Sequence, residues 1–175
     1  MALTADVIAE VRRRAGHACE FCGGSEIDVG GELTIDHFRP TSKGGTDELE
    51  NLLYCCSRCN LYRQAYWPEA SNSHVLWNPR QEPASKHFVE LTDGNLLPLT
   101  DAAAFTIRRL RLNRIPLVNW RLNRRQREIE QQLLDRYQQL TATLEQLNGQ
   151  LEALMQVQQA LLREQNELLR YLLEE

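Results

Sequence analysis

Two pairs of cysteines constrain the fold of this chain more than any other feature of its sequence. They are Cys19 with Cys22 and Cys56 with Cys59, and two residues separate the members of each pair. This spacing is typical of a closed tetrahedral site in which four thiolates hold a structural zinc ion. We therefore predict that Zn²⁺ ties a turn near the N-terminus to a segment much further along the chain.

The fifth cysteine, Cys55, is interpreted as a small core residue on a strand. Three residues separate it from Cys59, whereas two separate Cys56 from Cys59. Metal binding is more typical than disulfide bonding for cysteines of a chain that is not secreted. The N-terminus has no apolar stretch of the signal-peptide type, and no apolar run approaches the roughly 20 residues of a membrane span. We therefore expect a cytoplasmic protein.

The segment between and after the cysteine pairs reads as strand, loop, strand and helix. Residues 31–38 (GELTIDHF) and 51–55 (NLLYC) have the composition of short strands, and a polar loop joins them. Residues 57–66 begin the next helix, with Ser57 as the expected cap.

Further elements flank this segment. We expect a helix over residues 4–15 capped by Thr4, a hairpin over 87–99 that turns at Asp93-Gly94, and a helix over 101–113. Pro116 either interrupts that helix or opens a new one near its first turn. The predicted fold class is α+β.

Arginine is concentrated between residues 102 and 127, where no acid occurs. The arginines are Arg108, Arg109, Arg111, Arg114, Arg121, Arg124, Arg125 and Arg127. The chain has a net charge of −4, but residues 1–127 carry +2 and residues 128–175 carry −6. A charge run is usually a solvated helix face. Because no acid within the run can pair with these arginines, we favour a stripe that faces phosphates.

Leucines recur every seven residues along the C-terminal tail. These d positions of a heptad are Leu133, Leu140, Leu147, Leu154, Leu161 and Leu168. The a positions are Tyr137, Leu144, Leu151, Gln158, Gln165 and Leu172. This pattern predicts a coiled coil, because a straight helix drifts off a seven-residue repeat. We expect a homodimer or a higher oligomer.

Two features leave the form of the tail open. Apolar residues at some e positions widen the stripe and allow a four-helix arrangement; these are Leu134, Met155, Leu162 and Leu169. Asn148-Gly149 allows an antiparallel hairpin. We favour one continuous helix, because the heptad phase passes unbroken through Gly149.

Asp36 and His37 are adjacent near the end of the first predicted strand. On a regular strand they would point to opposite faces, but a bend at the strand end would let them converge. A carboxylate suits a hard cation, and an imidazole suits deprotonation of water. Alone, this dipeptide is weak evidence for a site.

The order of these groups resembles that of the HNH endonucleases, whose fold is a ββα-metal finger. The shared pattern is C-x-x-C, Asp-His, Asn and C-x-x-C-Asn over about Cys19 to Arg63. The later segments WNPRQEP, HFVELTDG and LRLNR resemble the continuation seen in many small bacterial HNH proteins. The tail lies outside the resemblance.

The resemblance implies a role for each matching residue. His37 corresponds to the general base, Asp36 to a metal ligand, and Asn51 to the asparagine that braces the loop and helps orient the base. Asn60 corresponds to a second metal ligand, in place of the histidine of the motif name. An Asp/Asn oxygen pair favours Mg²⁺ or Mn²⁺.

The predicted function is metal-dependent hydrolysis of DNA phosphodiesters by a bacterial HNH endonuclease, with RNA not excluded. The alternative is a catalytically silent zinc module that binds nucleic acid or protein and assembles through its coiled coil. The expected phosphate contacts are Arg39, Lys43, Arg108, Arg111, Arg121, Arg124 and Arg125; for Arg39 and Lys43, solvated loop charges are an equal alternative.

We expect three parts in the chain. These are a nuclease domain with structural zinc over residues 1–100, an arginine-rich helical connector over 101–127, and a helical coiled-coil tail over 128–175. A protein partner for the tail is a further expectation.

Overall fold

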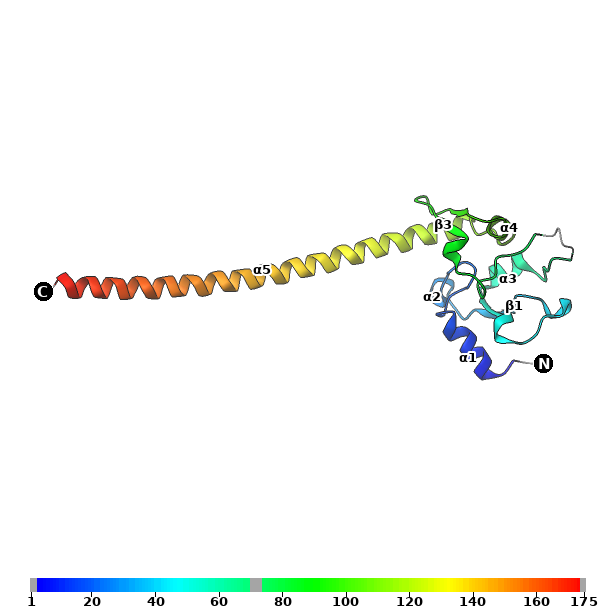
Figure 1. Ribbon diagram of the computed structural model, residues 1–175, viewed down its shortest axis with the longest axis horizontal. Helices are drawn as coiled ribbons and strands as arrows, with labels where there is room; N and C mark the ends of the chain where they lie inside the picture. The colour runs from blue at the N-terminus through cyan, green and yellow to red at the C-terminus, as the bar shows by residue number, and fades with distance from the viewer. Residues whose placement is uncertain (1–2, 70–73, 174–175) are drawn as a thin grey trace. The chain divides into compact units, whose positions relative to one another are not determined.

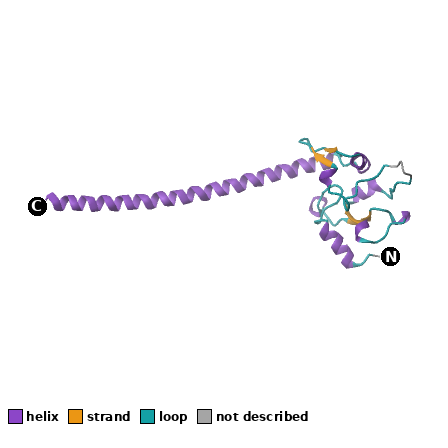
Figure 2. Cartoon of the chain, in the orientation of Figure 1, coloured by secondary structure: helices purple, strands orange, loops and turns teal. Residues whose placement is uncertain are grey.

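The computed structural model describes residues 3–69 and 74–173, and side chains up to residue 170. It divides into two compact units, Met1–Asn123 (the N-terminal unit) and Arg124–Glu175 (the C-terminal unit). Short strands, helices and loops make up the N-terminal unit, whereas the C-terminal unit is helical (Figure 2). The expected mixture of helices and small sheets is confirmed.

The first helix, α1 (Ala5–Arg14), begins at the predicted cap. The Thr4 hydroxyl accepts a hydrogen bond from the Val7 N–H, and Val11 packs fully buried in the core. A short helix that the sequence did not predict, α2 (Glu26–Val29), follows the first cysteine pair. Ser25 caps this helix and forms a reciprocal capping box with Asp28.

The two predicted strands pair in an antiparallel hairpin (Figure 1). They are β1 (Thr34–His37) and β2 (Leu52–Cys55), with His37 opposite Leu52. The loop between them contains two 3₁₀ turns, η1 (Thr41–Lys43) and η2 (Leu49–Asn51).

Helix α3 (Ser57–Arg63) follows β2 directly, which completes the ββα order. Its cap is Cys56 rather than the predicted Ser57, because the Cys56 sulfur accepts the Cys59 N–H. The helix ends at Arg63, earlier than predicted, because Gln64 adopts a φ of 54° that does not continue a helix.

A second hairpin pairs β3 (Phe88–Glu90) with β4 (Leu96–Pro98), preceded by the turn η3 (Ala84–Lys86). It turns through Gly94, which has a φ of +80°. A Cβ at this position would lie 2.8 Å from the Val118 carbonyl oxygen, so the turn requires glycine.

Helix α4 (Asp101–Leu110) packs beside this second hairpin. The Thr100 hydroxyl caps it, and the helix ends at Arg111, which adopts a left-handed conformation. Leu110 and Leu112 are fully buried. They join Leu52 and Leu53 of β2 and the cysteine cluster in one hydrophobic core.

Helix α5 (Ile115–Leu173) is continuous. Pro116 is its second residue, where the missing N–H costs no helical hydrogen bond, so the predicted helix opening is confirmed. Gly149 lies inside the helix, and the hairpin alternative at Asn148-Gly149 is wrong for this structure.

The leucines at the d positions of α5 are 52–67% exposed. The described part of α5 therefore forms no coiled coil with another segment of the same chain, and self-association stays a prediction. The last a position, Leu172, lies outside the residues whose side chains are described.

Candidate active site and metal centre

The four paired cysteines meet in the core of the N-terminal unit. Their sulfur atoms all lie within 4.8 Å of one another, and those of Cys22 and Cys56 are 3.8 Å apart. A tetrahedral ion with Zn–S bonds of about 2.3 Å requires sulfur separations of about 3.8 Å. The four side chains are buried, as expected of a structural site. The cluster therefore has the geometry and the donor chemistry of the predicted zinc centre.

Several groups prepare these sulfurs for a cation. Hydrogen bonds from neighbouring thiols lower the pKa of the Cys19 thiol well below its ordinary value, and the bond from Cys22 has the largest effect. The Cys59 N–H donates to the Cys56 sulfur at 3.4 Å, and an Arg114 amino group lies 4.0 Å from the Cys59 sulfur. A cationic guanidinium offsets the net negative charge that four thiolates keep around Zn²⁺.

Cys55 lies outside this cluster. It is fully buried on β2, and its S–H points to the Cys56 carbonyl oxygen at 3.5 Å. This confirms its interpretation as a core residue.

His37 ends β1 with its ring partly open to solvent, since 22% of its side chain is exposed. Its Nε2 atom lies 2.7 Å from Oδ1 of Asp47, in the loop between the strands. When Nε2 carries the proton, its N–H donates a hydrogen bond to the Asp47 carboxylate and Nδ1 is the basic ring nitrogen. Asp47 was not predicted from the sequence; its signal was an acid in the loop that must fold back beside the strand end.

Asp36 is not an isolated carboxylate. Its Oδ2 accepts from Nε of Arg63 at 2.7 Å and lies 2.6 Å from a second guanidinium nitrogen. Arg63 is 2% exposed and also donates to the carbonyl oxygens of His37 and Phe38. One buried guanidinium therefore anchors the end of β1 to the end of α3. The sequence reasoning did not identify Arg63 as part of the site.

Oδ1 of Asp36 lies outside the contacts with Arg63. The two Arg63 contacts occupy Oδ2, while Oδ1 accepts only the His37 N–H at 2.9 Å among the interactions of the described residues. One lone pair of Oδ1 is left. Asn60 lies three residues before Arg63 in α3, hence on the same side of the helix. A carboxylate oxygen and an amide oxygen fit Mg²⁺, which is usually bound by few protein groups and several waters.

Asn51 braces the loop, as its motif position implies. Its side chain accepts the Arg39 N–H at 2.7 Å and donates to the carbonyl oxygens of Arg39 and Thr46. Gly45 lies inside this bend: a Cβ there would come within 1.8 Å of the Arg39 carbonyl oxygen. The glycine and Asn51 together bring the loop back to the strand end, where Asp47 meets His37.

The predicted phosphate contacts divide into two groups. Arg39, Lys43, Arg108 and Arg111 are exposed residues of the N-terminal unit. The guanidinium groups of Arg39, Arg108 and Arg111 lie over the rings of Trp67, Phe105 and Tyr62, respectively. Arg124 and Arg125 belong to the C-terminal unit, where Arg124 lies 3.6 Å from Glu128, just beyond the acid-free run.

The expectation for Arg121 is wrong. Its side chain is 2% exposed, and its guanidinium donates to the carbonyl oxygens of Gly94 at 2.9 Å and Leu112 at 2.7 Å. It fastens the second hairpin and the α4–α5 junction inside the N-terminal unit. A buried guanidinium with these partners has no face left for phosphate.

The fold and the site define a class of domain: a ββα finger with four cysteines placed for zinc and an Asp-His pair at the end of its first strand. Residues 19–64 match the family described as HNH endonuclease. The match spans both cysteine pairs and confirms the resemblance inferred from the sequence. No curated protein and no solved structure gives a significant match. Among the described helices, none is both long and apolar enough to span a bilayer.

Proposed function

We propose that this protein is a metal-dependent endonuclease that hydrolyses phosphodiester bonds of DNA. The observation that carries the proposal is the pairing of His37 with Asp47, 2.7 Å apart, beside Asp36 in the segment that matches the HNH endonucleases. An imidazole ring that donates one N–H to a carboxylate has its other nitrogen available to take a proton.

In this mechanism His37 removes a proton from the attacking water. Asp47 accepts the hydrogen bond from Nε2 and so keeps the ring in the orientation and tautomer in which Nδ1 is the base. Asn51 positions the loop that carries Asp47. Arg63 donates a hydrogen bond to the carbonyl oxygen of His37, which limits movement of the base relative to the substrate.

Asp36 and Asn60 would hold a Mg²⁺ or Mn²⁺ ion. When bound, such an ion stabilises the charge that develops on the phosphate and the leaving oxygen. The zinc centre has a different task, since its four-cysteine set leaves no open position for chemistry. It stabilises the junction of β2 and α3, and thereby positions Asn60 and Arg63.

The exposed cations supply affinity for the backbone of the nucleic acid. In the proposal these are Arg39, Lys43, Arg108, Arg111, Arg124 and Arg125. Such contacts are independent of base sequence and weaken as salt rises.

In the proposal, the C-terminal tail joins two copies of the nuclease. A single finger has one active site and cuts one strand, whereas two copies joined through residues 128–175 address both strands of a duplex. Residues 101–123, expected as part of the connector, belong to the N-terminal unit, where Leu110 and Leu112 lie in its core.

One observation favours the alternative of a catalytically silent binding module. The ion pair with Arg63 neutralises much of the charge of Asp36, which weakens its attraction for a cation. A silent module would keep the zinc centre and bind nucleic acid without cutting it.

Cleavage of supercoiled plasmid in Mg²⁺ or Mn²⁺, with EDTA as the negative control, separates the two. We expect His37→Ala to lower the rate by about 10²- to 10⁴-fold, the usual contribution of a positioned base. His17→Ala is the matched control, because His17 is an exposed histidine whose ring contacts Arg12 and Glu26 and neither Asp36 nor Asp47. Cleavage by the His37 variant at the wild-type rate contradicts the proposal.

A further inference from the structure

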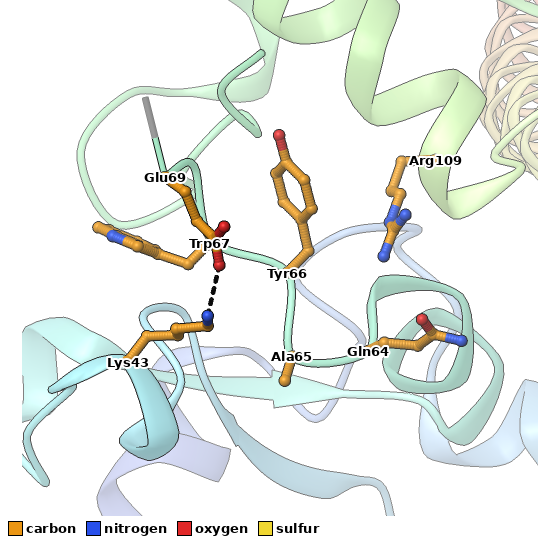
Figure 3. A pocket seen from close by; sticks show the side chains of 7 residues that line it. All are labelled: Lys43, Gln64, Ala65, Tyr66, Trp67, Glu69 and Arg109. Atoms are coloured by element: carbon orange, nitrogen blue, oxygen red, sulfur yellow. Dashed lines mark hydrogen bonds and ion pairs between the residues drawn. The ribbon is translucent and has the colours of Figure 1, made fainter. Parts of the chain in front are cut away.

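A pocket of about 540 Å³ opens in the N-terminal unit (Figure 3). It lies between the loop after β1, the segment that follows α3, and α4. The lining residues are Lys43, Gln64, Ala65, Tyr66, Trp67, Glu69 and Arg109.

The pocket is connected to the catalytic segment by direct contacts. The ring of Trp67 packs edge-on against Phe38, the residue after His37, with 6.1 Å between ring centres. Arg109 donates to the carbonyl oxygen of Arg63, whose guanidinium holds Asp36. Two residues that line the pocket therefore contact the neighbours of His37 and Asp36 directly.

The chemistry of the lining combines cations with aromatic rings. Lys43 and Arg109 lie at the two ends of the pocket, and half-buried Tyr66 and Trp67 line it (Figure 3). Arg109 lies over the ring of Tyr66 and Arg39 over the ring of Trp67, so both rings already stack with a cation. Positive charge interleaved with aromatic side chains is typical of surfaces that bind single-stranded nucleic acid. A base-paired duplex cannot present its base faces to such rings, because they are stacked within the helix.

Lys43 already has an anionic partner in the pocket. Its ammonium group lies 2.5 Å from Glu69, and this contact lowers the pKa of the Glu69 carboxyl group. Both side chains are exposed, at 39% and 74%, so the pair is readily exchanged for another anion. A phosphate group replaces the carboxylate without leaving Lys43 unpaired.

We propose that this pocket binds an unpaired nucleotide next to the cleavage position, which gives the proposed nuclease a preference for single-stranded or distorted DNA. A backbone phosphate displaces Glu69 from Lys43, and the base contacts the ring surface of Tyr66 and Trp67. The inference rests on the proposed function for its link to cleavage, but the binding step is testable alone.

The test measures binding of the full chain to a labelled single-stranded oligonucleotide and to the matching duplex, without added Mg²⁺ or Mn²⁺, by fluorescence anisotropy. Lys43→Gln should weaken single-strand binding about 3- to 10-fold and lower the slope of log affinity against log salt by about one phosphate contact. Lys86→Gln is the matched control, because Lys86 is an exposed lysine of η3 outside the pocket.

Two further variants separate this role from a structural one. Glu69→Gln frees Lys43 and should tighten single-strand binding a few-fold, whereas loss of a purely structural ion pair would not. Tyr66→Leu should weaken single-strand binding about tenfold and leave duplex binding nearly unchanged, whereas Tyr66→Phe keeps the ring and should bind like the wild type.

The outcomes are distinguishable from those of the cleavage assay. If Lys43→Gln behaves like Lys86→Gln, or if Tyr66→Leu weakens both substrates equally, the pocket does not bind an unpaired nucleotide. Cleavage that depends on His37 with an inert pocket overturns this inference only. Pocket-dependent binding without any cleavage supports the binding site and contradicts the nuclease.

Discussion

The two units treat the same residue type in opposite ways. Leu52 and Leu53 of the N-terminal unit are fully buried, whereas Leu147 and Leu154 of the C-terminal unit are 52% and 67% exposed. In the N-terminal unit, leucines pack around the cysteine cluster and hold the candidate site in place. In the C-terminal unit, a regular apolar stripe has no partner within the described part of its own unit. From this comparison we predict that zinc stabilises the N-terminal unit and that a second copy of the helix covers the apolar stripe of the C-terminal unit.

The largest effect that would sharpen this comparison is loss of the zinc centre. Cys56→Ala should release the metal and abolish cooperative unfolding of the N-terminal unit, because the binding energy of structural zinc contributes directly to folding. The helical circular-dichroism signal of the C-terminal unit should persist. Elemental analysis of chelator-washed protein and thermal unfolding measure the two effects.

Cys55→Ala is the matched control, because Cys55 is equally buried and adjacent but lies outside the cluster. It should keep one zinc ion per chain. A Cys56 variant that retains zinc, or a wild-type protein that folds without it, would show that the cluster is an ordinary part of the core.

The second effect concerns the exposed stripe. Replacing Leu147 and Leu151 together by Gln should weaken self-association by at least about 100-fold, because burial of each leucine contributes about 1.5–3 kcal/mol and 1.4 kcal/mol is a tenfold change in affinity. Melting of the N-terminal unit should not change. Light scattering or sedimentation at micromolar concentration measures the oligomer.

Gln146→Ala with Gln156→Ala is the control pair, since both positions lie off the a/d seam of the heptad. A wild-type chain that is monomeric at micromolar concentration would contradict the prediction that a second helix covers the apolar stripe. An oligomer that survives truncation after Arg127 would place the interface in the N-terminal unit.

A smaller effect tests the arrangement within the candidate site. Asp47→Asn should lower plasmid cleavage by about 10- to 100-fold, because an amide can present N–H to Nε2 and favour the wrong tautomer of His37. Glu48→Gln, at the neighbouring exposed acid, should have little effect. Single-turnover cleavage rates give the comparison, and zinc content should be unchanged in both variants. Equal rates for the two variants would remove Asp47 from the mechanism.

The smallest effect is a pH dependence confined to the N-terminal unit. Arg12 donates two hydrogen bonds of 2.7 Å to Glu26, and the Tyr54 hydroxyl donates a third. These bonds lower the pKa of the Glu26 carboxyl from 4.5 to about 2. Because the folded-state pKa is the lower one, the stabilisation is present above about pH 4.5 and is lost as the pH falls toward 2.

Glu26→Gln should therefore melt below the wild type at neutral pH, and the difference should shrink below about pH 4.5. Glu10→Gln, at an exposed i,i+3 ion pair with Arg13, should melt like the wild type throughout. A difference for Glu26→Gln that stays constant down to pH 3 would contradict the assignment.

The cysteine cluster and the two paired strands were predicted from the sequence, whereas most contacts that support the candidate site were not. The positions of the cysteine pairs, β1, β2 and the bracing role of Asn51 agree with the structure. Asp47, Arg63 and the short helix α2 were not predicted. Arg63 had a usable signal, since it lies one helical turn after Asn60 on the same side of α3.

What the sequence determined by itself depends on spacing along the chain. Two residues between paired cysteines, alternating apolar residues in short strands and a seven-residue leucine repeat each specify a local geometry without reference to distant groups. The tertiary structure alone decided which partners the charged groups found. Arg63 forms an ion pair with Asp36, and Arg121 is buried in the N-terminal unit instead of facing phosphate. A guanidinium is buried only where several acceptors converge, and those acceptors come from loops that meet after folding.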